Sequence, residues 1–227
     1  ASREQARRAI MAGAVEVDGR RVDKPGAPAK AQCEIAVRSR EPFVSRAGRK
    51  LAHALDTFQV EVVDRVTLDV GASTGGFTDC LLQRGAARVY AVDVGRGQLD
   101  AGLRADPRVV VLEGVNARHL GPDALPEQCS LAVLDLSFIS LVKVVPAILA
   151  HVVAGGLLLP LIKPQFEAGR GRVGKGGVVR DEALRRQVIA ETVAALAALG
   201  LQHQATCDSA VAGAAGNREA FALFRKP

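Results

Sequence analysis

Four charged residues stand where their side chains could do acid–base chemistry: Lys50, Asp135, Lys163 and Glu219. Asp135 and Lys163 each follow a strongly apolar run, which places them at the end of a buried strand. A lysine there is rarely present for solvation, and a lysine or carboxylate so placed can accept, donate or orient a proton. Lys50 and Glu219 give a weaker signal, since an ordinary surface salt bridge explains them equally well.

A glycine-rich loop, D-V-G-A-S-T-G-G at residues 69–76, follows another apolar run. In a doubly wound sheet ligands bind beyond the carboxyl ends of the strands, where glycines let the backbone approach a ligand. Position 73 is Ser, so the nicotinamide fingerprint G-x-G-x-x-G is absent, and the missing Walker-type lysine excludes a P-loop. A loop without a phosphate clamp suits a nucleoside that carries an amino acid tail. Glycines that only make a tight turn are the alternative.

Two polar residues follow the next two predicted strands. Asp93 ends the second, where its carboxylate can accept two hydrogen bonds from a ribose diol, and Asn116 after the third could reach a base edge. This set resembles the nucleoside site of S-adenosylmethionine-dependent methyltransferases. The alternatives are that Asp93 only caps a helix and that Asn116 is a turn residue.

The elements that must position these residues alternate along the chain. We expect strands at 66–70, 89–94, 109–113, 131–136, 156–162 and 220–224, and helices at 45–58, 77–84, 142–153 and 181–199. Such alternation predicts an α/β fold, a parallel sheet with helices on both faces. Before it, a helix at 2–12, a hairpin around Asp18-Gly19 and a strand at 34–37 predict a small α+β unit.

The charge is concentrated at the front of the chain. Residues 1–50 hold 12 Lys and Arg against 6 Asp and Glu, and the remaining residues hold 18 of each. A basic module beside a neutral domain favours a polyanionic partner, most simply nucleic acid, over a merely solubilising face. We expect no signal peptide, spanning segment, metal site or disulfide framework, because the four cysteines are widely spaced and no apolar stretch is long enough. These features favour a cytoplasmic protein.

Six motifs occur in order: SRAGRKL at 45–51, DVGASTGGFT at 69–78, DVGRGQL at 93–99, DLSFIS at 135–140, KPQFE at 163–167 and GNRE at 216–219. The chain closely resembles the TlyA family of ribosomal RNA 2′-O-methyltransferases, whose catalytic domain is related to FtsJ. The resemblance implies a Rossmann-like class I methyltransferase fold with a mostly parallel seven-stranded sheet, over residues 42–227. Residues 1–41 resemble an α-L RNA-binding module that lacks its first helix.

The resemblance also assigns roles. It implies a catalytic tetrad of Lys50, Asp135, Lys163 and Glu219, and S-adenosyl-L-methionine as the cofactor. The cofactor-binding residues that we expect are Asp69, Gly71, Ser73, Thr74, Gly75, Gly76, Phe77, Asp93, Asn116 and Asp135.

Ribosomal RNA or ribosomal subunits are the expected partner, with cytidine the expected nucleotide and the oligomeric state open between monomer and weak dimer. We expect RNA contacts from Arg3, Arg7, Arg8, Arg20, Arg21, Arg46, Arg49, Arg170, Arg172 and Lys175. The last three lie in a glycine-rich segment, 165–177, that we interpret as a loop closing on the RNA backbone. Phe43, Phe138 and Phe166 are the candidates for stacking on a base.

The chemistry fits these residue types. A ribose hydroxyl is a poor nucleophile that must be oriented and relieved of its proton. Lys163 is our candidate for base or hydroxyl positioner, and Lys50 would lower its pKa. Asp135 would position Lys163 and counter the sulfonium charge, and Glu219 would orient Lys50 or the ribose. Two other functions stay open: a membrane-active haemolysin, a label attached to some relatives, and an RNA-binding protein without catalysis.

Overall fold

The computed structural model describes residues 3–11, 14–37, 42–169, 171–174, 176–213 and 216–227. The chain divides into two compact units, residues 1–42 and 43–227.

The first unit is a helix and a three-stranded antiparallel sheet. Helix α1 (Arg3–Met11) precedes β1 (Val15–Val17), β2 (Arg20–Val22) and β3 (Ile35–Val37), in the order β2-β1-β3. Asp18 and Gly19 both have positive φ, 50° and 74°, as a two-residue hairpin turn that matches the strand twist requires. The hairpin predicted around this pair is confirmed.

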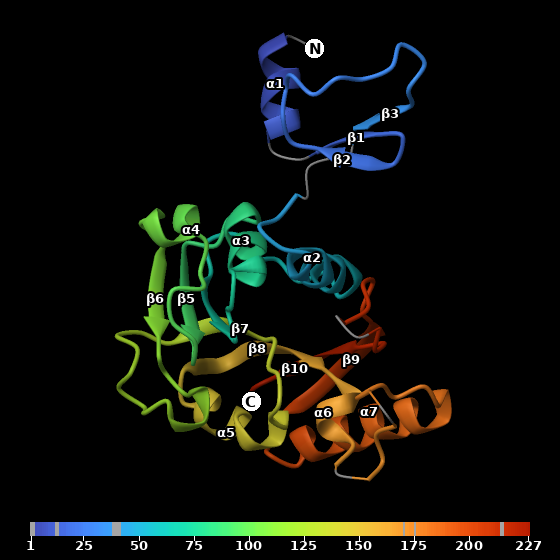
Figure 1. Ribbon diagram of the computed structural model, residues 1–227. Helices are drawn as coiled ribbons and strands as arrows, with labels where there is room; N and C mark the ends of the chain where they lie inside the picture. The colour runs from blue at the N-terminus through green and yellow to red at the C-terminus, as the bar shows by residue number, and fades with distance from the viewer. Residues whose placement is uncertain (1–2, 12–13, 38–41, 170, 175, 214–215) are drawn as a thin grey trace. The chain divides into compact units, whose positions relative to one another are not determined.

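The second unit is built on a seven-stranded sheet in the order β6-β5-β4-β7-β8-β10-β9 (Figure 1). Its strands are β4 (Val66–Val70), β5 (Arg88–Asp93), β6 (Val109–Glu113), β7 (Cys129–Leu134), β8 (Val152–Ile162), β9 (Gln202–Asp208) and β10 (Ala220–Arg225). The strands from β6 to β8 are parallel to one another, and β10 is antiparallel to both of its neighbours. The predicted α/β fold with a mostly parallel sheet is confirmed.

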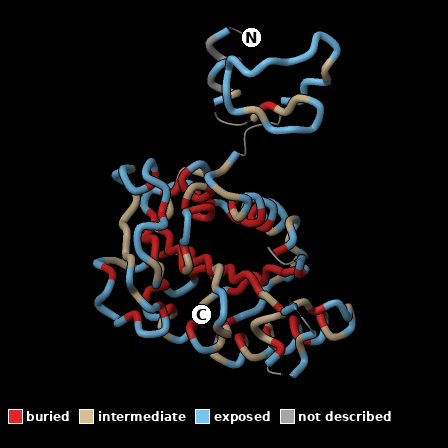
Figure 2. The backbone as a smooth tube through the Cα atoms, in the orientation of Figure 1, coloured by how far each residue is buried: buried red, intermediate tan, exposed pale blue. Residues whose placement is uncertain are grey.

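Helices cover both faces of this sheet. The helices are α2 (Ala47–Thr57), α3 (Gly76–Gln83), α4 (Ala101–Ala105), α5 (Val145–Leu149), α6 (Pro164–Glu167) and α7 (Glu182–Ala197), with 3-10 turns at Ala117–His119 and Leu141–Lys143. One core joins α2, α3 and α4 to the sheet and the other joins α5 and α7 to its opposite face. The inner strands are buried along most of their length in Figure 2, as expected for a sheet covered on both sides. Of the edge strands, β6 is half-buried and β9 is mostly exposed.

The helix predicted at 142–153 is wrong. Pro146 lies in the first turn of the short helix α5, where its fixed φ is favourable, and α5 ends at Leu149. Val152 and Val153 belong to β8, which Gly155, at φ 75°, does not interrupt. Helix α4 and strand β9 were not predicted; β9 is mostly exposed and polar, so its sequence lacks the apolar run of a buried strand.

Candidate active site

Two of the four predicted catalytic residues meet at the ends of neighbouring parallel strands. Asp135 directly follows β7, and Lys163 directly follows β8. Lys163 Nζ lies 2.6 Å from Asp135 Oδ1 and donates a hydrogen bond of 3.0 Å to Ser137 Oγ. The contact with Asp135 is a charge pair without the angles of an aligned hydrogen bond, since Oδ1 has no hydrogen-bond partner in the described part of the chain.

The other two residues form a second, more deeply buried pair. Lys50 on α2 donates a hydrogen bond of 2.6 Å to Glu219 Oε2, and only 7% and 2% of these side chains are exposed. Glu219 lies directly before β10, so the pair connects α2 to the start of this strand. A buried pair of this kind is not the surface salt bridge that the sequence left as an alternative.

All four side chains line one cavity of about 540 Å³. Ser45, Arg46, Ser137, Phe138, Gln165 and Asn217 line it as well. Two lysines and two carboxylates thus face a single space at the carboxyl edge of the sheet, where ligands of this fold class bind.

A second cavity, of about 510 Å³, lies over the ends of β4, β5 and β7. Four of the predicted cofactor-binding residues besides Asp135 line it: Gly71, Ser73, Asp93 and Asn116. Asp135, Gly71 and Ser73 line both cavities, so the two spaces adjoin at the end of β7. The structure therefore brings the predicted cofactor site and the predicted tetrad together.

Asp93 and Asn116 have local structural roles as well. Asp93 accepts hydrogen bonds from the backbone N–H of Ser73 at 2.8 Å and of Gly95 at 2.7 Å, which fixes its carboxylate beside the cavity. Asn116 Oδ1 accepts from the N–H of Arg118 at 3.1 Å, so the turn-capping interpretation also applies to it.

Five residues predicted to bind the cofactor line neither cavity: Asp69, Thr74, Gly75, Gly76 and Phe77. Phe77 is in the core, with its ring centroid 5.9 Å from that of Phe221. A Cβ on Gly75 would lie 2.3 Å from a Leu103 methyl group, so this glycine is required by packing between elements. Their contact with a cofactor stays a prediction.

Asp69 is fully buried beneath the glycine loop. Its Oδ2 accepts a hydrogen bond of 2.7 Å from the Thr78 hydroxyl, and its Oδ1 has no partner among the described residues. Burial raises the pKa of Asp69 to about 7, with the negative charge of Asp135 adding to the effect and the Thr78 hydrogen bond opposing it.

Two further residues that were not predicted hold the segments around the first cavity. Asn217 accepts a hydrogen bond from the Val179 N–H and donates one to the Gly177 carbonyl, both at 2.9 Å. Glu167 accepts from the Ser140 hydroxyl at 2.7 Å and from the Leu141 N–H at 2.9 Å, and burial raises its pKa. Both lie in recognised motifs, KPQFE and GNRE, which is the signal that could have identified them.

The predicted RNA contacts are mostly on the surface. The exposed ones are Arg3, Arg7, Arg20, Arg21, Arg46, Arg49 and Arg172. Arg172 forms an ion pair of 2.9 Å with Glu191 on α7, so part of the segment 165–177 is tied to the helix. The Arg8 side chain, Arg170 and Lys175 lie outside the described residues.

The three aromatic candidates separate into two groups. Phe138 is 90% exposed at φ 65°, and its ring centroid lies 4.9 Å from that of Phe166. Both rings line the first cavity. Phe43 instead packs beside Gly48, whose Cβ would lie 2.3 Å from the ring, so it belongs to the core.

The described residues contain no group of three or more His, Cys, Asp or Glu that could hold a metal ion. None of their helices is long and apolar enough to cross a membrane.

Comparison with known proteins places both units in families. Residues 43–226 match the FtsJ-like methyltransferase family, and residues 1–34 match the S4 domain. The Mycobacterium tuberculosis protein named 16S/23S rRNA (cytidine-2'-O)-methyltransferase TlyA is 46% identical over 226 residues, which are 99% of this chain and 84% of that protein.

Relatives with a different kind of name match equally widely. Hemolysin A of Brachyspira hyodysenteriae is 42% identical over 98% of this chain and 93% of its own length. A solved structure from Streptococcus thermophilus, also named for hemolysin, superposes with a TM-score of 0.82 at 42% identity, covering 99% of this chain and 83% of the other. The chain therefore belongs to the FtsJ-like methyltransferase family, as a member of its TlyA group with an S4 domain at the front.

Proposed function

We propose that this protein transfers a methyl group from S-adenosyl-L-methionine to a ribose 2′-hydroxyl of ribosomal RNA, at cytidine. The observation that carries the proposal is the meeting of Lys50, Asp135, Lys163 and Glu219 around one cavity that adjoins a second, nucleoside-sized cavity at Asp135. The name of the Mycobacterium tuberculosis relative supplies the nucleotide and the RNA.

The second cavity fits the proposed cofactor. Its volume of about 510 Å³ is in the usual range for a small-molecule site. The Asp93 carboxylate keeps acceptor positions for a ribose diol beyond its two backbone contacts, and Gly71, at φ 88°, keeps the end of β4 free of a side chain. When bound there, the cofactor supplies an electrophilic methyl group.

The first cavity would hold the acceptor ribose. Lys163, which contacts Asp135 and Ser137, would bind the 2′-hydroxyl and take its proton. Holding the acceptor beside the methyl donor supplies a large part of the rate by itself, as orientation does in general. The Lys50–Glu219 pair forms another wall of the cavity and fixes where the ribose can lie.

The RNA would be recognised by charge, shape and stacking. The S4 unit carries four exposed arginines from the predicted set, Arg3, Arg7, Arg20 and Arg21, which suit phosphate contacts. The exposed Phe138 ring and its neighbour Phe166 offer a platform for an unstacked base beside the catalytic lysine, Lys163 Nζ lying 6.0 Å from the Phe166 centroid. Since ribosomal subunits are the proposed substrate, we place the protein in the cytoplasm.

Methyl transfer to RNA is the direct test. Labelled S-adenosylmethionine is incubated with separated unmodified ribosomal subunits and with naked rRNA, and 2′-O-methyl sites are then mapped. We expect label on ribose in one or both subunits from the wild type and none from Lys163→Ala. If the protein binds the cofactor but transfers no methyl group, ribosomal RNA is not its substrate. If the protein does not bind the cofactor, the proposed reaction is wrong.

The role of Lys163 has its own test. Lys163→Arg keeps the charge and the donors but cannot give up a proton near neutral pH. If Lys163 takes the proton in the wild type, the single-turnover rate of Lys163→Arg should be about 10²- to 10⁴-fold lower. A near-normal rate across the pH profile would leave Lys163 only the positioning role.

The hemolysin name of some relatives raises a second function, which leakage of dye-loaded vesicles tests. We expect no leakage at concentrations that give full methyl transfer. Leakage by both the wild type and Lys163→Ala would show a membrane activity independent of the active site.

A further inference from the structure

A buried arginine outside the tetrad lies behind the Lys50–Glu219 pair. Arg185 is in the first turns of α7, and only 4% of its side chain is exposed. It lines neither of the two adjoining cavities, so it does not belong to the site described above. A guanidinium is always charged, and burying one requires partners for its donors.

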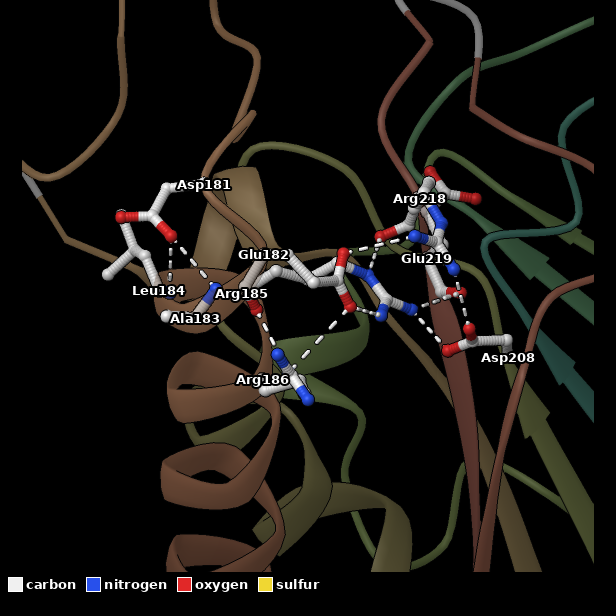
Figure 3. A network of polar contacts seen from close by, with 9 residues as sticks. All are labelled: Asp181, Glu182, Ala183, Leu184, Arg185, Arg186, Asp208, Arg218 and Glu219. Atoms are coloured by element: carbon white, nitrogen blue, oxygen red, sulfur yellow. Dashed lines mark hydrogen bonds and ion pairs between the residues drawn. The ribbon is translucent and has the colours of Figure 1, made fainter.

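The partners of Arg185 come from its own helix α7, from β9 and from the segment directly before β10, as Figure 3 shows. Its Nε donates to the Arg218 carbonyl at 2.9 Å, and its Nη2 lies 3.5 Å from the Glu219 carbonyl. The other contacts are with the carboxylates of Glu182, at 3.0 Å, and of Asp208 at the end of β9. The guanidinium thus ties the backbone of residues 218–219 to α7 and to β9.

A second arginine reinforces the same two carboxylates from outside. Arg218 donates to Glu182 Oε2 and to Asp208 Oδ2, each at 3.0 Å. Asp208 therefore bridges the guanidinium groups of Arg185 and Arg218 (Figure 3). Glu182 bridges the same two groups and also lies 3.9 Å from the exposed guanidinium of Arg186. Because each guanidinium reaches the two carboxylates through different nitrogens, its orientation is fixed as well as its position.

Glu219 receives its position from this network. Its side chain points to Lys50, on an element that is remote in sequence, while its own backbone is held by Arg185 and by the Ser209 N–H, which donates to the Glu219 carbonyl at 2.9 Å. The room around the carboxylate is small, since a Cβ on Gly213 would lie 2.5 Å from Glu219 Oε1. A small movement of residues 218–219 would therefore separate the carboxylate from Lys50.

We propose that Arg185 is a positioning residue for the methyl-transfer site, acting through Glu219 on Lys50. This rests on the proposed function. Arg185 holds the backbone from which Glu219 projects, so that the Lys50–Glu219 pair keeps one geometry beside the acceptor ribose. Misplacement of a supporting group by about 1 Å costs on the order of 100-fold in rate.

The test compares neighbouring arginines of the same helix. Arg185→Gln should lower kcat by about 10- to 100-fold and leave the KM for RNA and the affinity for S-adenosylmethionine nearly unchanged. The kcat of Arg185→Lys should lie between those of Arg185→Gln and the wild type, because lysine keeps the charge but lacks the planar guanidinium. The matched control is Arg186→Gln, which removes the same charge from a side chain that is 73% exposed and lines neither cavity. It should stay within about twofold of the wild type, as expected for an exposed charge.

A double-variant cycle separates positioning from general stability. If Arg185 acts through Glu219, Arg185→Gln combined with Glu219→Gln should be no slower than Glu219→Gln alone. Multiplied losses, or a normal kcat in folded Arg185→Gln, would overturn the inference. If Arg185→Gln does not fold, Arg185→Lys and Asp208→Asn undergo the same cycle.

A readout without catalysis completes the design. Acetylation of Lys50 by acetic anhydride, followed by mass spectrometry, should be faster in Arg185→Gln than in the wild type and in Arg186→Gln. Unchanged Lys50 reactivity in a variant that has lost kcat would also contradict the inference. A wild type that methylates no ribosomal RNA would instead refute the proposed function.

Discussion

The buried carboxyl group of Asp69 should make the stability of this protein depend on pH in an unusual direction. Burial raises its pKa from 3.8 to about 7 in the folded chain. Between these values the native state keeps a proton that the unfolded chain has released, so stability falls as the pH rises through this window. At about 1.4 kcal/mol for each pH unit, the cost of ionising Asp69 reaches about 4 kcal/mol near pH 7 and above.

Asp69→Asn removes this titration while keeping an acceptor for the Thr78 hydroxyl. The amide places an N–H where Oδ1 has no partner, which costs about 1–3 kcal/mol at every pH. We therefore expect the variant to be less stable than the wild type near pH 4.5 and more stable near pH 8. Urea unfolding at four pH values measures the difference. Glu113→Gln is the control, because the pKa of Glu113 is lowered and its contribution to stability therefore changes with pH in the opposite direction. Parallel stability curves for the wild type and Asp69→Asn would show that Asp69 is ionised in the folded state and would refute the reasoning.

Three other predictions follow from individual contacts. Gly213→Ala should lower the single-turnover rate of methyl transfer by about tenfold or more, because its Cβ would lie 2.5 Å from Glu219 Oε1; a normal rate in rapid-quench measurements would contradict this. Asp93→Asn should weaken S-adenosylmethionine binding by about tenfold, because one charge-assisted hydrogen bond is lost. Calorimetry measures this affinity, and an unchanged value would show that Asp93 does not bind the cofactor. Cys80 and Cys129, whose pKa values burial raises to about 12, should resist alkylation at pH 8 until urea unfolds the chain, as mass spectrometry of the labelled peptides would show.

Part of the site was predictable because parallel strands end at one edge. Asp135 and Lys163 each follow an apolar run, so their meeting needs only the rule that the carboxyl ends of parallel strands lie together. The Lys50–Glu219 contact joins residues 169 positions apart, one on a helix and the other directly before an antiparallel strand. No local pattern relates the two positions, and only the family resemblance associated them.

The glycine loop shows why residue types alone leave roles mixed. The sequence predicted that the loop lacks large side chains so that a ligand can approach its backbone, and Gly71 does line both cavities. A Cβ on Gly76, however, would lie 2.2 Å from Ser45 Oγ, and one on Gly75 would meet Leu103. Close approach to a ligand and close approach to another element both require glycine, and the one-letter sequence does not distinguish them.

The arrangement of charges in the first cavity bears on how any variant of the tetrad should be interpreted. Lys50 and Glu219 balance each other in a buried position, and Lys163 and Asp135 balance each other beside them. Removing one member leaves its partner as an uncompensated charge, which in a buried pair destabilises a protein by about 3–5 kcal/mol. A lost activity after one substitution therefore contains both the missing group and the displaced partner. Arg185 holds Glu219 through the main chain, so its substitution leaves both charges of the Lys50–Glu219 pair in place. Arg185→Lys also keeps the charge that pairs with Glu182 and Asp208, and it therefore changes the geometry at this site with the least change in charge.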